Sequence, residues 1–417
     1  MAVSRKPGPA GCRLALAIVA GFAPVTFAQS PPVTADYAVT VSEQYTDNHV
    51  FSGQSTFITT VTPSLVLRRD TEISKVAVQA AVSGTSYSNS RAAKDAVSYR
   101  LGLDTTFIRD RNTFRFDADV VRDSRFSTVP GSPDFQLARA QRTSYTFDPT
   151  FIRSLTERLS VNVGAGYTST AFDQSLNGAL FDFTNTRVSS GLQYRVTELD
   201  TIGVSASSAR YRTDPDTTSS DSTSLQANWD RRWTERLETT VAFGQTQSTT
   251  RTRRNAVICS SPNIIDCLLG LAPFVTVPVG TQSDTNTPTW NVTGAYRFAE
   301  RSVLSVRYGQ DILPSAGGAV TTRELTTVSV NHQISERISG NASYQRSQST
   351  FTGLPGVTSA TSVFESISLR MAYNLASDWS LDGAVTRSES TVQSGSRVAH
   401  AVFFSIRKDW RNNRIWP

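Results

Sequence analysis

Apolar and polar residues alternate with a period of two along most of this chain. Between Val97 and Phe107 the odd positions are mostly apolar, whereas the even positions include Arg100 and Asp104. Successive side chains of a β-strand point to opposite sides, so this pattern predicts strands with one apolar and one polar face. The alternating stretches are each about a dozen residues long, where strands of soluble proteins average five or six.

Short charged segments separate these stretches at nearly regular intervals. Thr156-Glu157-Arg158-Leu159 recurs as Thr234-Glu235-Arg236-Leu237 and, in modified form, as Ser335-Glu336-Arg337-Ile338. A tight turn between alternating strands, repeated about every 40 residues, is typical of an array of antiparallel hairpins.

Eighteen strands follow from this reading. The predicted spans are 36–47, 54–68, 72–86, 95–107, 112–125, 142–154, 158–171, 183–196, 200–212, 221–233, 237–250, 286–298, 302–312, 322–334, 338–350, 362–375, 379–391 and 397–410. An even number puts all short turns on one side and all long connections on the other. Sixteen strands stay open as an alternative, because Pro63 and Pro149 interrupt their strands.

A water-soluble β-sandwich would also alternate, but three features favour a transmembrane barrel. The strands are long, aromatic residues such as Trp229, Trp233 and Trp379 gather at strand ends, and the second face is too polar to be a core. The predicted fold is therefore all-β, a transmembrane antiparallel up-and-down β-barrel of about 18 strands. We expect it to form a single domain over residues 29–417 in the bacterial outer membrane.

The first 28 residues predict an export signal. Arg5, Lys6 and Arg13 supply positive charge before the apolar run Leu14 to Val25, and a small-residue site ends at Ala28. Removing these three cations from 41 leaves 38 basic against 35 acidic residues, a net charge of +3. With no basic cluster interleaved with aromatics, we expect no nucleic-acid partner.

The longest irregular connection, residues 252–284, is predicted to be a functional extracellular loop. Its apolar run Leu268 to Val279 would be costly to expose, so we expect it to fold inward or to cap the mouth. Cys259 and Cys267 lie eight positions apart within it. In an exported protein this spacing favours a disulfide over a metal site, which would need more ligands.

No motif of catalysis, cofactor binding or metal binding stands out, so we expect neither an enzyme nor a cofactor or metal. The charged residues on the inward face are the candidates for function. They are Arg100, Arg115, Arg187, Arg195, Arg232, Arg297, Arg307, Arg370, Arg397 and Arg407, with Asp104, Asp117, Asp119 and Asp230. One interpretation is a salt-bridge lattice that stiffens the wall, and the other is a mildly cationic pore that binds anionic or sugar solutes.

Several short motifs carry a family resemblance. Tyr45-Thr46-Asp47-Asn48, the segment Val61 to Leu65, the Thr-Glu-Arg-Leu turns and the pairs Tyr194-Arg195 and Tyr296-Arg297 resemble a β-barrel porin family found with exosortase and exopolysaccharide gene clusters. This resemblance implies an outer-membrane location and a role in, or in support of, polysaccharide export. The partners that we expect are outer-membrane lipid and lipopolysaccharide, the barrel-assembly machinery and a polysaccharide export apparatus.

The last strand has two alternative ends. Barrels of this compartment commonly finish on an aromatic residue, so the strand either ends at Trp410 and leaves a short tail, or runs to Trp416. Two functions also stay open. One is a conduit for polysaccharide or other solutes, and the other is a structural or assembly barrel with a plugged lumen.

Overall fold

The computed structural model describes residues 33–123, 141–173, 181–214, 217–259, 274–314, 320–352, 361–392 and 395–416. Within these ranges the chain forms 18 β-strands and one short 3-10 helix, η1 (His49–Phe51). The strands are β1 (Val33–Thr46), β2 (Thr56–Asp70), β3 (Ser74–Tyr87), β4 (Ala96–Arg109), β5 (Asn112–Asp123), β6 (Arg142–Ser154), β7 (Leu159–Phe172), β8 (Asp182–Arg195), β9 (Asp200–Asp214), β10 (Thr218–Arg232), β11 (Leu237–Cys259), β12 (Phe274–Ala299), β13 (Ser302–Pro314), β14 (Val320–Gln333), β15 (Ile338–Thr352), β16 (Thr361–Ala376), β17 (Trp379–Val392) and β18 (Gly395–Trp416).

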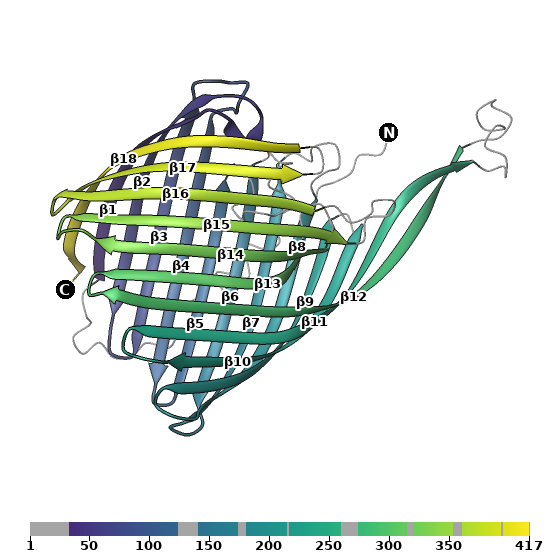
Figure 1. The fold of residues 1–417 in the computed structure, drawn as a ribbon, viewed down its shortest axis with the longest axis horizontal. Helices are drawn as coiled ribbons and strands as arrows, with labels where there is room; N and C mark the ends of the chain where they lie inside the picture. The colour runs from purple at the N-terminus through teal and green to yellow at the C-terminus, as the bar shows by residue number, and fades with distance from the viewer. Residues whose placement is uncertain are drawn as a thin grey trace.

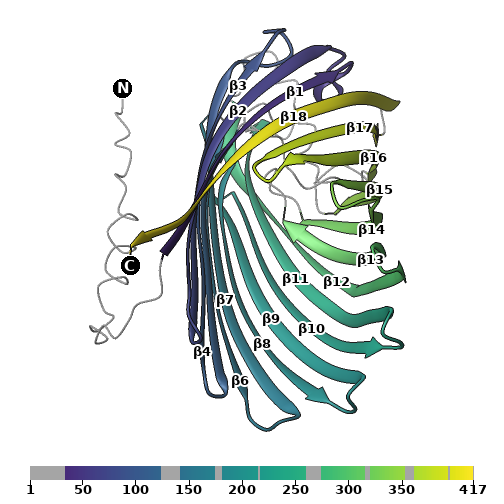
Figure 2. The same cartoon turned by 90° about the vertical axis from the view of Figure 1, so that its left-hand side faces the viewer.

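The strands close into a ring (Figures 1 and 2). Each strand pairs antiparallel with its neighbours in sequence, and β18 pairs with β1 to complete the circle. Val41, for example, lies opposite Ile406 across this seam. A closed ring leaves no strand edge unpaired, which a sheet in hydrocarbon requires because no water is there to satisfy the backbone. The predicted fold class, an 18-stranded antiparallel barrel, is confirmed.

The outer face is apolar. Leu101, Leu369 and Val402 are each about half exposed on it, while Arg100 and Ser368 lie on the opposite face. On β16 the apolar outer positions run from Ile367 to Leu375, eight residues apart (375 − 367). At ~3.3 Å per residue and a tilt of about 40°, this band is roughly 20 Å tall, comparable with the hydrocarbon-facing band of such barrels.

The repeated turn motif has one shared hydrogen-bond arrangement. Thr156 Oγ1 accepts the backbone N–H groups of Arg158 and Leu159, at 3.2 and 2.9 Å. Thr234 and Ser335 accept the N–H groups of the second and third residues after them in the same way. A hydroxyl that satisfies two backbone donors fixes a tight turn locally, which explains why Thr or Ser begins the motif.

The two ends of the barrel differ. The short turns all lie at one end, which we call the short-turn end, and the longer connections lie at the other, the long-loop end (Figure 1). The Thr-Glu-Arg-Leu segments therefore mark a single rim of the molecule. Among the described residues, no helix is long and apolar enough to cross a bilayer.

Segment 252–284 differs from the prediction of an irregular, inward-folding loop. β11 continues to Cys259 and β12 begins at Phe274, and the two strands stay paired in register throughout, with Thr252 opposite Thr281. This two-stranded ribbon projects beyond the other strands and away from the mouth (Figure 1). Ladder hydrogen bonds pair the facing edges of the two extended strands without help from the barrel wall, and the outer edges of the ribbon face water. Residues 260–273 lie outside the described residues.

The last strand runs to Trp416, the longer of the two predicted alternatives. Trp416 lies opposite Val33 and Trp410 lies opposite Tyr37, so both aromatic residues belong to the strand that closes the ring. The predicted signal segment, residues 1–28, lies outside the described residues and stays a prediction.

Candidate functional site: the inner wall and mouth of the barrel

The strand register places the candidate residues on the inner wall. Each lies on the polar side of its strand. Val188, Tyr296 and Met371, which are the sequence neighbours of Arg187, Arg297 and Arg370, are exposed on the outer face, so these arginines point inward. The inner wall thus carries Arg100, Arg115, Arg187, Arg195, Arg232, Arg297, Arg307, Arg370, Arg397, Arg407, Asp104, Asp117, Asp119 and Asp230. Whether any of them contacts a solute stays a prediction.

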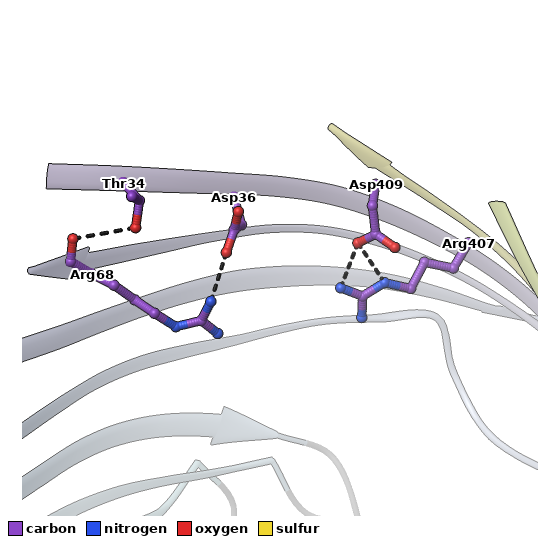
Figure 3. A network of polar contacts seen from close by, with 5 residues as sticks. All are labelled: Thr34, Asp36, Arg68, Arg407 and Asp409. Atoms are coloured by element: carbon purple, nitrogen blue, oxygen red, sulfur yellow. Dashed lines mark hydrogen bonds and ion pairs between the residues drawn. The ribbon is translucent and has the colours of Figure 1, made fainter. Parts of the chain in front are cut away.

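Some of the inner arginines form ion pairs along the wall. Arg100 Nε lies 2.9 Å from Asp119 Oδ1 on the next strand, and Arg370 Nε lies 3.1 Å from Asp382 Oδ1. Near the short-turn end, Arg407 binds Asp409, two residues away on its own strand, at 2.7 Å (Figure 3). These pairs join adjacent strands or positions of one strand, so they stiffen the wall without bridging the lumen.

Further polar contacts continue this pattern near the seam. Arg68 Nη1 binds Asp36 Oδ2 at 2.6 Å between β2 and β1, close to the Arg407–Asp409 pair (Figure 3). Asp230 accepts hydrogen bonds from Thr240 Oγ1 and from Asn228 Nδ2, at 2.6 and 3.0 Å.

Other inner arginines have weaker anchorage. Arg307 Nε donates to the amide oxygen of Asn291 at 3.1 Å, and among the described residues it has no ion-pair partner. In the part of the chain that the structure describes, no hydrogen bond or ion pair is formed by the side chains of Arg115, Arg187, Arg195, Arg232 and Arg297. The predicted salt-bridge lattice is therefore only partial.

Carboxylates gather in one row on the inner wall of β4 to β6. Asp104 lies opposite Asp117, which in turn lies opposite Asp148. Like charges on directly opposed positions destabilise a sheet, so this row is costly unless lumen water or a cation screens it. Arg115, next to Asp117 on β5, and Arg187 on β8 lie close enough to lower this cost, whereas Arg297 and Arg307 lie on β12 and β13, away from the row.

The inner charges are exposed even though they point into the ring. The side chain of Arg100 is 58% exposed and that of Arg370 is 54% exposed, despite their ion pairs. Side chains that filled a lumen would be buried against one another. At the level of these arginines, the described residues therefore leave room for water.

Small hydroxyl residues line the inner wall nearer the long-loop end. Ser220 Oγ lies 3.0 Å from Ser248 Oγ and accepts a hydrogen bond from Thr250 Oγ1 at 3.1 Å, and both serines are buried. They border a cavity of about 350 Å³, which Arg187 and Asp311 also line. Hydroxyl, guanidinium and carboxylate groups around one space offer donors and acceptors to a polyol or sugar.

The first long connection, residues 47–55, turns inward and forms a mouth loop. Phe51 is 5% exposed, and its ring lies 6.4 Å from that of Phe364 on the inner wall of β16. Arg397 Nη1 donates to the Phe51 carbonyl at 2.7 Å, and Asn48 Nδ2 donates to the Val398 carbonyl at 2.7 Å. The mouth loop thus covers the inner wall where β16 and β18 begin and β17 ends.

Phe51 adopts a strained backbone conformation, with φ at +58°. A bulky residue in the left-handed region costs of order 1–3 kcal/mol and persists only when its surroundings enforce it. The buried ring and the hydrogen bond from Arg397 supply that enforcement. Arg397, expected to contact a solute, here holds the mouth loop in place.

A second contact fixes the start of the mouth loop. The His400 backbone N–H donates to Asp47 Oδ1 and the His400 ring lies 2.7 Å from Asp47 Oδ2. The backbone donor, followed by the ring, holds the pKa of Asp47 below its usual range.

The mouth loop was not predicted from the sequence. Residues 47–55 show no periodic pattern, and Phe51 reads as an ordinary loop aromatic. Its partners Phe364 and Arg397 are more than 300 residues away in sequence, so only the closed ring brings them together. The predicted disulfide cannot be placed, because Cys267 lies outside the described residues.

Comparisons with known proteins find similar solved structures but no matching protein family. No protein-family model matches the chain. No curated protein matches it by sequence. Among solved structures, the chain is similar to the ferric-catecholate import receptor Fiu of E. coli, with 9% identity, 92% of this chain and 82% of that chain covered, and a TM-score of 0.48.

Two outer-membrane proteins of other bacteria give similar values. OccK5 of Pseudomonas aeruginosa has 9% identity, covers 92% of this chain and 99% of its own, and has a TM-score of 0.47. OccAB4 of Acinetobacter baumannii has 11% identity, the same coverages and a TM-score of 0.45. At these identities and scores, none of the three informs the solute of this chain, and the architecture rests on its own strand pairing.

The location of the protein follows from the barrel itself. A closed ring of 18 antiparallel strands with an apolar outer band, tight turns at one end and longer loops at the other is the architecture of outer-membrane barrels. In such barrels the tight turns face the periplasm, so the short-turn end is the periplasmic end. The protein is a β-barrel of the bacterial outer membrane.

Proposed function

We propose that the protein is an outer-membrane channel for hydrophilic solutes. The observation that carries this proposal is the exposure of the inner arginines, above all Arg100 and Arg370, inside a closed ring. Rings of 16–18 strands are wide enough to hold an aqueous channel. The partial pairing of the inner charges supports the proposal, because Arg297 and Arg307 have no carboxylate partner within the described residues.

The solute class that we favour is polysaccharide, with the barrel serving exopolysaccharide export as conduit or accessory. Guanidinium groups bind carboxylates of acidic sugars in a bidentate manner, and the hydroxyl rows near the mouth match neutral sugar hydroxyls. The short motifs that resemble exopolysaccharide-associated porins support the same class. An export apparatus in the periplasm and inner membrane is the partner that this role requires.

A structural barrel with a closed lumen is the second candidate. The inward mouth loop favours it, because Phe51 covers part of the inner wall at the long-loop end. The ion pairs argue against it, since Arg100–Asp119 and Arg370–Asp382 run along the wall and do not cross the lumen.

Planar-bilayer recording separates the two candidates. Purified barrel should show open-pore conductance that an anionic polysaccharide blocks, with weaker block at high salt because the charges are screened. Arg297→Ala with Arg307→Ala should weaken the block about tenfold or more, as expected for the loss of two charge-assisted contacts. As a matched control, Arg346→Ala with Arg387→Ala removes two outward-facing arginines and should leave the block unchanged.

The outcomes are distinct. Folded barrel without conductance, in the wild type and in a variant lacking the mouth loop, would exclude the channel. Conductance without polysaccharide block would retain the channel and exclude this solute.

A further inference from the structure

An apolar hollow lies on the outer face of β14 to β18, the face turned toward the viewer in Figure 1. Its volume is about 670 Å³ and its lining is almost wholly apolar. The outward side chains of Leu369, Met371, Val402 and Phe404 border it, and Gly383 lies between them. A hollow of this size lies within the range of small-molecule pockets, roughly 300–1,000 Å³.

The hollow exists because glycines replace side chains on this face. Gly340 and Gly383 occupy outward positions whose neighbours are large. A Cβ at Gly383 would meet no atom closer than the Phe403 oxygen at 4.0 Å, and one at Gly340 would meet Ile334 Cδ1 at 3.7 Å. Both contacts are ordinary van der Waals distances, so packing does not require these glycines. Their effect is to leave space facing the lipid.

A cation lies on the same face, at its periplasmic end. Lys408 lies opposite Trp379, and Phe404 lies opposite Gly383, so the lysine is four residues from the hollow. At ~3.3 Å per residue this separation is roughly 13 Å along the strand. The outward positions between them, Leu381 and Ile406, are apolar as well.

The lysine is held in place rather than free in solvent. Its Nζ lies 4.8 Å from the centroid of the Trp379 ring and 6.0 Å from that of Trp410, and it forms an ion pair with Asp378 in the adjacent turn. Its side chain is 21% exposed. An ammonium group has three donors and Asp378 occupies one, which leaves donors for an anion at the level where tryptophans meet lipid headgroups.

We propose that this face binds one glycerophospholipid of the periplasmic leaflet. The phosphate accepts hydrogen bonds from Lys408 between the two tryptophan rings, and one acyl chain runs past Leu381 and Ile406 into the hollow. The charge pattern favours a lipid over a second barrel. The remaining N–H donors of Lys408 lie at one end of an apolar groove, which matches the single phosphate end of a phospholipid, whereas a second barrel would have to bury the Lys408–Asp378 pair.

Native mass spectrometry of the detergent-purified barrel tests the proposal. The probes are phosphatidylglycerol and a diacylglycerol with the same chains, which differ in the phosphate headgroup. Wild type should retain one phosphatidylglycerol and bind diacylglycerol about tenfold more weakly, a difference of roughly 1.4 kcal/mol. Lys408→Gln should remove this preference, and Gly340→Leu with Gly383→Leu should fill the hollow and reduce retention of both lipids.

Two matched controls change a lysine on the inner face and a glycine of the outer face away from the hollow. Lys75→Gln removes the same charge from the inner wall of β3, and Gly294→Leu adds the same side chain on the outer face of β12, where a Cβ also has room. Both controls should retain lipid like the wild type. Heat-modifiable electrophoretic mobility checks that every variant is folded.

Three outcomes would overturn the proposal. The first is equal retention in Lys408→Gln, the filled-hollow variant and the wild type. The second is loss of lipid in the two controls as well, which would mean nonspecific adhesion. The third is a dimer mass without lipid that the filled-hollow variant abolishes, which would assign the hollow to a second copy of the chain.

Discussion

At the scale of single residues, the periplasmic rim depends on one hydroxyl per turn. Thr156, Thr234 and Ser335 each accept two backbone N–H groups and begin the repeated motif. The charged residues within each motif, such as Glu157 and Arg158 after Thr156, are exposed. The hydroxyl therefore determines the geometry of the turn, and the charges keep it soluble.

Thr234→Val should lower the free energy of unfolding by about 1 kcal/mol, because two backbone donors lose their acceptor and only water replaces it. Thr234→Ser keeps the hydroxyl and should behave like the wild type. Urea unfolding in lipid vesicles, followed by tryptophan fluorescence, measures both. Equal loss in the two variants would mean that the methyl group, not the hydroxyl, stabilises the turn.

Asp378 gives the barrel a predictable acid response. The hydrogen bond from Lys408, followed by the charge of Lys408, lowers the pKa of this carboxylate below 3.8. A lowered pKa in the folded state adds stability above the unfolded value, and this stability is lost as pH falls through the lowered pKa.

Asp378→Asn should therefore be less stable than the wild type from pH 5 to 7. The difference should shrink below pH 3.8 and vanish at lower pH. Urea midpoints over this range provide the measurement, with Glu157→Gln as a control at another short turn. A difference independent of pH would show that the ion pair does not contribute through this titration.

At the scale of elements, the strands and tight turns follow from sequence because their causes are local. Alternation with period two and a turn hydroxyl both lie within one hairpin, so β4, β10 and β16 were predicted to within a few residues. The extended β11–β12 ribbon was missed, because Pro273, Pro278 and an apolar run obscure any alternation there.

In the candidate site, too, the local features could be predicted from sequence and the long-range contacts could not. Alternation alone indicates that Arg100 and Asp119 share a face, but their ion pair depends on the register between β4 and β5. The mouth loop depends on residues from distant strands and left no signal in the sequence. Lys408 is unusual in the sequence, because it is one of only four lysines in a chain that otherwise uses arginine. Its position beside Trp379 on the outer face became apparent only from the structure.

The projecting ribbon should not be part of the pore. Replacing residues 254–279 by an Asn-Gly turn would join Arg253 and Gly280, which lie opposite each other in the ladder. We expect unchanged single-channel conductance, because the ribbon extends away from the mouth. As the contrasting variant, Phe51→Gly should widen the mouth and raise conductance. If conductance changed only in the variant without the ribbon, the ribbon would have to be part of the pore.

At the scale of the whole molecule, one pairing converts a row of hairpins into a ring. All other pairings join strands that are neighbours in sequence, whereas β1 and β18 meet across nearly the whole chain. Long-range closure is the entropically costly step, because the ends of a long chain must meet before contacts form.

Linking the seam covalently should confirm that the ring is closed in the membrane. Val41→Cys with Ile406→Cys, in a chain with Cys259→Ser and Cys267→Ser, places two cysteines opposite each other on the outer face. Directly opposed strand positions have Cα atoms about 4.5–5.5 Å apart, which suits a disulfide. Oxidation should give a faster-migrating species on denaturing gels at unchanged conductance. Failure to oxidise in folded barrel would indicate an open seam.

The seam is also an ordinary antiparallel pair that lacks a turn. Val33 lies opposite Trp416 at the periplasmic end, so a tight turn of the Thr-Glu-Arg-Leu kind would suffice to connect them there. A chain circularly permuted in this way, and cut at any of the longer loops, would contain the same 18 pairings in a different genetic order. The fold therefore depends on which strands are neighbours around the ring, and not on which strand comes first in the chain. The chain could begin at any of the longer loops and form the same barrel.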